Sequence, residues 1–199
     1  MPKLLVASSN QGKIREYSVL LDNLGYEIVT LDNLGIAKSV VTELGSSYEE
    51  NATLKALTYA RLSQLITLAD DSGLEVDALQ GEPGIHSARL AGQGASDEDR
   101  VNLLLARMRD IPWDRRSARF KCVIAIATPQ GQVTLCHGEC SGLIALEPRG
   151  SNGFGYDPIF YFPELGRTMA ELPLKMKNQL SHRARAAQQA REVLRQLLQ

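Results

Sequence analysis

Apolar and polar residues alternate in blocks along the chain, and the first blocks predict strands and helices in turn. Residues 3–7 form a short apolar run, and a polar loop separates them from apolar residues at helical spacing between about 12 and 23. A second apolar run at 27–31 precedes a helical pattern that Ser47 is expected to cap. This alternation, with the hairpin described next, predicts an α/β fold with a mixed β-sheet.

A hairpin is predicted in the middle of the chain. Residues 120–127 are nearly all apolar, which is typical of a central strand buried on both faces. A turn sequence at 128–131 separates this run from 132–140, its expected partner. Residues 142–146 are expected to form another strand.

Two adjacent carboxylates follow the apolar run at 65–69. Asp70 and Asp71 lead into Ser72 and Gly73, so we interpret the stretch as a buried strand that ends in a tight loop. Because side chains alternate along a strand, the two carboxylates are expected to face different ways, one toward a cleft and one bracing the loop. Neighbouring carboxylates raise each other's pKa, and Mg²⁺ is a cation that often binds such a pair. An Asp turn that only caps the next element is the alternative.

The loop between the first strand and the first helix is suited to an anion. Backbone N–H groups and the helix dipole point toward its polar residues, and a lysine adds a positive charge. The spacing of its glycine differs from a Walker A loop, and a plain turn capped by an asparagine is the alternative. The loop consists of Ser8, Ser9, Asn10, Gln11, Gly12 and Lys13.

Two later stretches also indicate ligand binding. Three glycines flank Phe154 and Tyr156, and an aromatic face at such a loop can stack on a nucleobase. A hinge loop whose aromatic residues fill a gap is the alternative. Lys177, His182 and Arg183 gather near the start of the last helix, where positive charge is unfavourable, so we infer a bound anion there. A solvated basic face is the competing interpretation.

Composition limits the classes of function. The 199 residues fit one domain, 1–199, and 22 basic residues against 23 acidic ones give a net charge of −1. A nucleic-acid polymer or an anionic membrane is therefore not an expected partner. No apolar run is long enough for a membrane span, and the first apolar stretch is too short for a signal peptide, so a cytoplasmic protein is expected.

The cysteines do not indicate a disulfide scaffold or a zinc site. The chain has three cysteines, an odd number without a framework of spacings. Cys136 and Cys140 flank His137, but no second pair with zinc spacing accompanies them. Buried thiols are therefore the favoured interpretation.

Six motifs together resemble the inosine triphosphate pyrophosphatases, enzymes that hydrolyse non-standard purine nucleoside triphosphates. The motifs appear in the family's order and span nearly the whole chain. They are Ser8-Ser9-Asn10-Gln11-Gly12-Lys13, Glu49-Glu50-Asn51-Ala52, Ala69-Asp70-Asp71-Ser72-Gly73-Leu74, Gly84-Ile85-His86-Ser87-Ala88-Arg89, Gly153-Phe154-Gly155-Tyr156-Asp157-Pro158 and Ser181-His182-Arg183.

The resemblance implies a fold and an activity. The implied fold is a long, bent mixed β-sheet flanked by helices, with two lobes and the active site in the cleft between them. The implied activity is Mg²⁺-dependent cleavage of ITP, dITP and XTP to the monophosphate and pyrophosphate, which prevents their incorporation into nucleic acids. A homodimer is implied as well.

The resemblance also implies roles for individual residues. Asp71 would be the general base and a metal ligand, and Ser72 would contact the substrate. The loop from Ser8 to Lys13 would hold the triphosphate. Phe154 would stack on the base in a wall continued by Gly155, Tyr156 and Asp157, and Lys177, His182 and Arg183 would recognise the purine's oxygen substituents or the phosphates.

Two positions depart from the family pattern. Ser8 stands where the family usually has threonine, and the hydroxyl is kept. The segment Thr42-Glu43-Leu44-Gly45 stands where the family often has Glu-Glu-Thr-Gly, so Glu43 is the one carboxylate left there as a second metal ligand.

Two other functions are compatible with the same residues. One is a nucleotide-binding regulatory module without turnover, which the carboxylate pair argues against because a triphosphate binder gains nothing from added negative charge. The other is a pyrophosphatase for a modified pyrimidine or for a standard nucleoside triphosphate.

Overall fold

The chain forms two compact units in the computed structural model, which describes residues 1–37, 41, 45–92 and 94–198. Unit 1 comprises Met1–Asp71, Cys122–Gly138 and Arg183–Gln199, and unit 2 comprises Ser72–Lys121 and Glu139–His182. Three of the strands listed below, β3, β4 and β5, contribute residues to both units. The single domain expected from the length stays a prediction.

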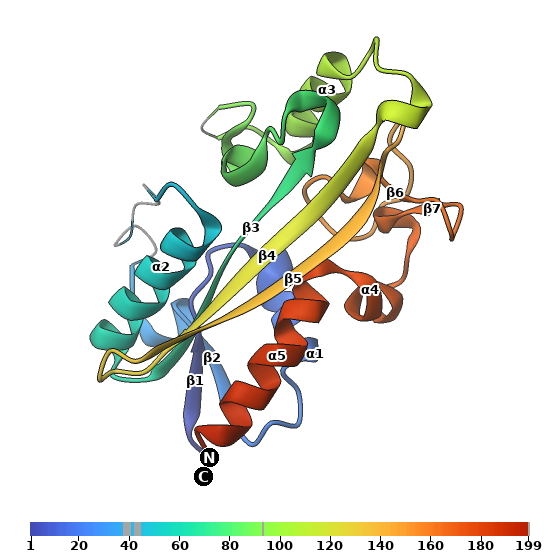
Figure 1. Ribbon diagram of the computed structural model, residues 1–199. Helices are drawn as coiled ribbons and strands as arrows, with labels where there is room; N and C mark the ends of the chain where they lie inside the picture. The colour runs from blue at the N-terminus through green and yellow to red at the C-terminus, as the bar shows by residue number, and fades with distance from the viewer. Residues whose placement is uncertain (38–40, 42–44, 93, 199) are drawn as a thin grey trace. The chain divides into compact units, whose positions relative to one another are not determined.

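The described residues form one mixed sheet of seven strands in the order β2-β1-β3-β4-β5-β6-β7 (Figure 1). The first pairs, β1 with β2 and β1 with β3, are parallel, whereas β5 with β6 and β6 with β7 are antiparallel. The predicted mixed sheet is thereby confirmed. The strands are β1 (Lys3–Val6), β2 (Glu27–Thr30), β3 (Ile66–Val76), β4 (Ser117–Ala127), β5 (Val133–Ile144), β6 (Phe160–Phe162) and β7 (Arg167–Thr168).

Helices connect the strands, and three of them begin at a capping side chain. The side chains of Asn10, Ser47 and Ser96 each accept a backbone N–H of the helix that follows. Among the described residues, no helix is both long and apolar enough to span a membrane. The α-helices are α1 (Gln11–Leu20), α2 (Tyr48–Ser63), α3 (Asp97–Arg107), α4 (Leu174–Leu180) and α5 (His182–Gln196). Short 3-10 helices lie at Asp32–Leu34, Asp77–Leu79, Gly84–Arg89, Trp113–Arg115, Asp157–Ile159 and Met169–Glu171.

In unit 1, α1 and α5 pack on one face of the strands, and α2 lies on the other side (Figure 1). Alternate residues of β4 enter the core shared with α1 and α5, and the residues between them are buried as well. The apolar run in β4 is therefore a strand buried on both faces, as predicted. The core on the α1 and α5 side contains Leu4, Val6, Tyr17, Leu21, Leu68, Cys122, Ile124, Ile126, Ala186, Ala187, Ala190 and Leu194, with others.

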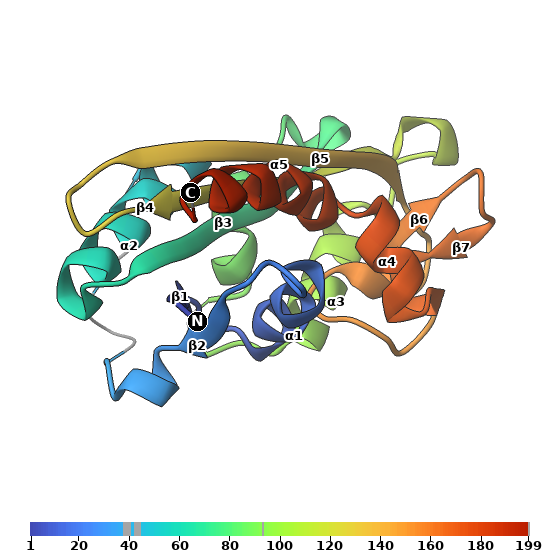
Figure 2. The same cartoon turned by 90° about the horizontal axis from the view of Figure 1, so that it is seen from below.

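Helix α5 runs along β5 in unit 1 (Figure 2). The side chain of Gln189 accepts the backbone N–H of His137 at 3.1 Å and donates to the carbonyl oxygen of the same residue at 2.9 Å. One glutamine side chain thus satisfies both backbone groups of a strand residue, in place of a neighbouring strand.

Strand β3 corrects the prediction that the chain turns after Asp71. The strand continues to Val76, so both aspartates and Gly73 lie inside it. The local turn signals are outweighed because partners from other elements hold each carboxylate, as described below. The sheet pairing of the backbone then continues through the glycine.

Strand β5 corrects a second boundary. It runs without interruption to Ile144, so the separate strand expected at 142–146 is the end of the same element. Gly142 does not mark a break. A Cβ atom there would lie 2.6 Å from the carbonyl oxygen of Tyr161 on β6, so glycine permits the close approach of the neighbouring strand.

Unit 2 contains a buried arginine that the pattern of the sequence did not indicate. The Arg116 side chain donates through Nε to the carbonyl oxygen of Ile144 at 2.7 Å and through Nη2 to that of Ala145 at 3.0 Å. Nη1 donates to the carbonyl oxygen of Met108 at 2.7 Å and to that of Ile111 at 3.1 Å. Only 2% of Arg116 is exposed. It therefore satisfies carbonyl groups just after α3 and at the end of β5, most of them buried.

Replacing Arg116 with methionine is expected to lower the free energy of unfolding by about 2–4 kcal/mol, because it leaves buried carbonyl groups without donors. The matched control is Arg119→Met, three residues further along the chain in β4, since Arg119 is partly exposed and pairs with Asp77 at the surface. That change should cost less than about 1 kcal/mol. Urea denaturation of both variants checks the prediction, and equal losses would contradict the role given to Arg116.

Candidate functional site

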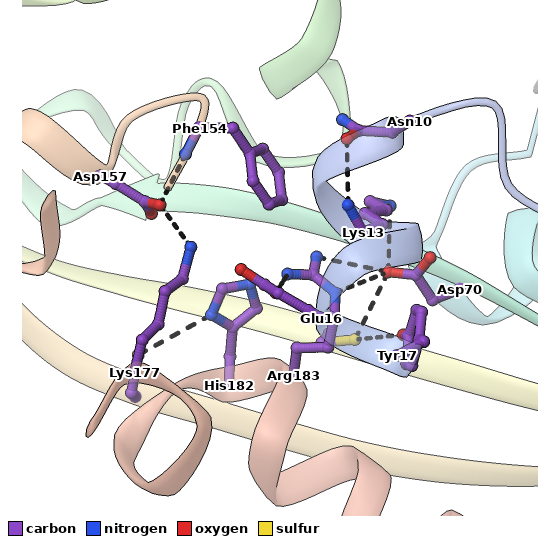
Figure 3. A network of polar contacts seen from close by, with 12 residues as sticks. Asn10, Lys13, Glu16, Tyr17, Asp70, Phe154, Asp157, Lys177, His182 and Arg183 are labelled. Atoms are coloured by element: carbon purple, nitrogen blue, oxygen red, sulfur yellow. Dashed lines mark hydrogen bonds and ion pairs between the residues drawn. The ribbon is translucent and has the colours of Figure 1, made fainter. Parts of the chain in front are cut away.

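The centre of unit 1 is a buried ion cluster around Asp70. Its Oδ2 atom lies 3.0 Å from Nζ of Lys13 and 3.4 Å from both Nε and Nη2 of Arg183 (Figure 3). The thiol of Cys122 donates to the same oxygen at 3.7 Å. Burial alone would raise the pKa of Asp70, but Lys13, Arg183 and Lys55 outweigh it and hold that pKa well below its usual range. Asp70 is therefore ionised at neutral pH.

Arg183 is held by a second carboxylate within the same unit. Its Nη1 atom donates to Oε2 of Glu16 at 2.7 Å, and Glu16 and Arg183 are 2% and 1% exposed. Lys13 and Glu16 are three residues apart on α1, which places them on the same helix face. For Arg183, the positive charge at the start of α5 thus has internal partners. The charge of Arg183 is therefore explained without a bound anion, and by itself it no longer indicates one.

Asp71 faces the other side of β3. Its Oδ2 atom accepts the side-chain amide of Asn51 at 3.0 Å, and Oδ1 of Asn51 accepts the backbone N–H of Gly45 at 2.9 Å. The second bond fixes which end of the Asn51 amide points at the carboxylate. Lys55, one turn along α2, donates to the backbone carbonyl of Asp70 at 2.6 Å. The predicted opposite orientation of the two aspartates is confirmed, but Asp70 braces α1 and α5 rather than a loop.

The predicted anion loop joins β1 to the N-terminus of α1. Oδ1 of Asn10 accepts the backbone N–H of Lys13 at 3.1 Å, and the backbone N–H of Asn10 reaches Oγ of Ser8 at 3.2 Å. Ser9, Asn10 and Gln11 are exposed, whereas Gly12 is buried. The loop therefore places exposed polar groups at a helix N-terminus, beside the lysine that pairs with Asp70.

Unit 2 contains a second cluster, around Asp157. Oδ2 of Asp157 accepts the backbone N–H of Phe154 at 2.9 Å and also binds Nζ of Lys177 (Figure 3). The same Nζ atom lies 4.6 Å from the centre of the Phe154 ring, a cation–π contact. Gly153 has a φ of +77°, and a Cβ atom there would lie 1.9 Å from Oδ2 of Asp157. Glycine is therefore required for this loop to close on the carboxylate.

His182 and Tyr156 complete the residues predicted in unit 2. The His182 ring stacks on Phe120, with centroids 4.6 Å apart, and its Nδ1 atom lies 3.9 Å from Sγ of Cys140. The hydroxyl of Tyr156 donates to the carbonyl oxygen of Ser87 at 2.8 Å, and the residue is 4% exposed. Tyr156 is thus part of the unit 2 core, with its polar end anchored.

The structure places the predicted residues in two groups. Ser8 to Lys13, Asp71 and Arg183 belong to unit 1, and Ser72, Phe154 to Asp157, Lys177 and His182 belong to unit 2. Glu43 lies outside the described residues. The three cysteines are buried, as predicted.

Several partners of these residues were not predicted from the sequence. They are Glu16, Asn51, Lys55 and Cys122. A signal for Glu16 was its position three residues after Lys13 on one helix, and no comparable local signal indicated the contact of Cys122 with Asp70.

The Asp71 carboxylate is a hard oxygen donor of the kind that Mg²⁺ prefers. Among the described residues, no group of three or more His, Cys, Asp or Glu side chains is placed to hold a metal ion. Mg²⁺ often takes only one or two carboxylates from a protein and completes its shell with substrate phosphates and water. The Asp71 carboxylate, oriented by Asn51, fits that mode of binding, whereas Oδ2 of Asp70 is occupied by cations.

Replacing Asp70 with asparagine is expected to lower the free energy of unfolding at pH 7 by about 3–5 kcal/mol, because Lys13 and Arg183 lose a buried charge partner. The pKa of Asp70 is depressed in the folded state, so its contribution is present above the unfolded pKa. That contribution is lost as the pH falls below about 4. Denaturation at several pH values should show a smaller acid-induced loss in the variant, and parallel curves would contradict this account.

Comparisons with known proteins agree with the geometry. The model of the Ham1 family matches residues 4–193. A dITP/XTP pyrophosphatase from Symbiobacterium thermophilum is 50% identical over 99% of this chain and 97% of the relative, and one from Vibrio cholerae is 48% identical over 94% of each. The solved structure of a HAM1 protein from Coxiella burnetii has a TM-score of 0.87 and 41% identity over 98% of both chains.

A second solved structure, the Staphylococcus aureus Ham1 protein, has a TM-score of 0.83 and 43% identity over 96% of this chain and 98% of the other. Sequence and fold therefore agree over nearly the full length. The chain belongs to the Ham1 family, which confirms the resemblance carried by its six motifs.

Proposed function

We propose that the protein hydrolyses non-standard purine nucleoside triphosphates, namely ITP, dITP and XTP, to the monophosphate and pyrophosphate. Such an activity keeps these nucleotides out of nucleic acids. Relatives named dITP/XTP pyrophosphatase, aligned over nearly the whole chain, support it. The observation that carries it is Asp71, a nearly buried carboxylate oriented by an amide on the face of β3 opposite the ion cluster.

The residues of unit 1 are assigned to the triphosphate. Exposed N–H and polar groups at the start of α1, with the charge of Lys13, suit phosphate oxygens. Asp71 accepts a proton from the attacking water as the new oxygen–phosphorus bond forms. The bond between the α and β phosphates breaks, and pyrophosphate leaves with the electron pair.

A requirement for Mg²⁺ is part of the proposal. When bound, the ion neutralises charge on the phosphate oxygens and so lowers the barrier to attack. Asp71 would supply a carboxylate oxygen to it. Asp70 is assigned a different task, because its pairing with Lys13 and Arg183 holds α1 and α5 against β3.

The residues of unit 2 are assigned to the base. Phe154 offers an aromatic ring for stacking, and Asp157 fixes both its backbone and the nearby Lys177. Lys177 and His182 supply N–H donors, which can bind a purine oxygen at C6. Adenine carries an amino group at the same position, which is itself a donor and cannot accept these hydrogen bonds.

We also propose that the protein is a homodimer in the cytoplasm. The family resemblance supports the dimer, and two-fold pairs are the commonest soluble oligomers.

The proposed activity is tested with a panel of triphosphates, each assayed for monophosphate and pyrophosphate with Mg²⁺ and with a chelator. We expect kcat/KM for ITP, dITP and XTP to exceed that for ATP by about a hundredfold or more, because mismatched buried donors lose their partners. The chelator should abolish turnover. Equal values for ATP and ITP, preference for a pyrimidine, or binding without release of pyrophosphate would each contradict the proposal.

Asp71→Asn is expected to lower kcat by about a hundredfold to ten-thousandfold, because asparagine cannot accept the proton. The volume is preserved, so the melting temperature and triphosphate binding should change little. Asp70→Asn is the paired variant, assayed at a temperature where it is fully folded, and its kcat should fall less. The opposite order of the two kcat values would show that the roles of the carboxylates are exchanged.

A further inference from the structure

The loop of unit 2 that carries Phe154 is anchored to the first turn of α3. Asp97 is the first residue of that helix, and its Oδ2 atom accepts the backbone N–H of Gly155 at 2.6 Å. Gly155 directly follows Phe154. The anchor therefore acts on the peptide group next to the ring assigned to the purine.

A neighbouring arginine makes this anchor rigid. Arg100, one turn further along α3, binds Oδ1 of Asp97. Its Nη1 atom also donates to the carbonyl oxygens of Ala95 at 2.7 Å and Ala88 at 3.2 Å. Burial alone would raise the pKa of Asp97, but Arg100 and the N–H of Gly155 lower it, so the carboxylate is a charged acceptor.

Capping of α3 does not account for this arrangement. Ser96 accepts the backbone N–H of Asp99, and Asp99 accepts that of Ser96, so these two residues form the capping box. The Asp97 carboxylate binds Arg100 and the backbone N–H of Gly155 instead. Two acidic residues in one helical turn thus have different tasks, and only Asp97 reaches the loop.

Two carboxylates hold consecutive amides of the loop. Asp157 accepts the N–H of Phe154, and Asp97 accepts the N–H of Gly155. The peptide groups on both sides of the Phe154 Cα are thereby held, which sets the direction of its Cα–Cβ bond. Glycine residues contribute little rigidity of their own, so these two bonds restrict the backbone of the loop.

We infer that Asp97 is a positioning residue for the purine end of the substrate, acting through Gly155 on Phe154. This inference rests on the proposed function. Its consequence is a selective one. Losing the anchor weakens base binding and discrimination between bases, while the residues at the phosphates keep their arrangement.

The test compares Asp97→Ala with Asp99→Ala, which remove the same charge from the same helical turn. We expect Asp97→Ala to raise KM for ITP about tenfold and to change kcat by less than about twofold. The ratio of kcat/KM for ITP to kcat/KM for ATP should fall. Asp97→Asn keeps an acceptor oxygen and should recover part of the loss. Asp99→Ala should lower the melting temperature through the lost cap and leave KM unchanged.

The outcomes separate the inference from the proposed function. If the wild-type protein releases no pyrophosphate from any triphosphate, the proposed function fails and the inference fails with it. If the wild type is active but Asp97→Ala keeps its KM and discrimination, Asp97 is only structural. Equal rises in KM for the Asp97 and Asp99 variants would show a general helix effect and would also overturn the inference. If Asp97→Ala does not fold, KM for ITP and the discrimination between ITP and ATP are measured on Asp97→Asn, and they decide the question in the same way.

Discussion

A buried carboxylate in the middle of a sheet strand is the constraint on which unit 1 depends. Asp70 cannot remain ionised away from water unless cations surround it. Lys13 from α1 and Arg183 from α5 supply them, and Glu16 provides a second negative charge that pairs with Arg183. The four side chains carry two positive and two negative charges. Both helices are therefore held against β3 by this network of ion pairs.

The alternation of β3 lets one strand serve two purposes. Asp70 faces α1 and α5, and its charge is used up by internal pairs. Asp71 faces α2, where Asn51 orients it and Lys55 binds the backbone next to it. Neighbouring carboxylates would ordinarily raise each other's pKa. Here they point to opposite faces and have different partners, so a structural charge and a proposed catalytic one can be adjacent in sequence.

In unit 2 the constraint is different, because the loop that carries Phe154 and Gly155 lacks the regular backbone pairing of a strand. Carboxylates take the place of a neighbouring strand as acceptors, since Asp157 and Asp97 bind the consecutive N–H groups of Phe154 and Gly155. The hydroxyl of Tyr156 adds a third anchor on Ser87. Residues that a motif suggests for ligand contact can thus act mainly by holding the loop.

The sequence by itself determined the features that depend on near neighbours. Hydrophobic periodicity predicted α1 and α2 and the buried 122–127 part of β4, and the caps at Asn10 and Ser47 follow from residues three positions away. The tertiary structure decided what depends on distant partners. β3 continues past Asp71, Arg183 pairs with Glu16, and Arg116 satisfies carbonyl groups of α3 and β5, because those groups are brought together only by folding. Local turn signals carry a modest free energy, and buried charges without partners cost far more, so the distant contacts prevail.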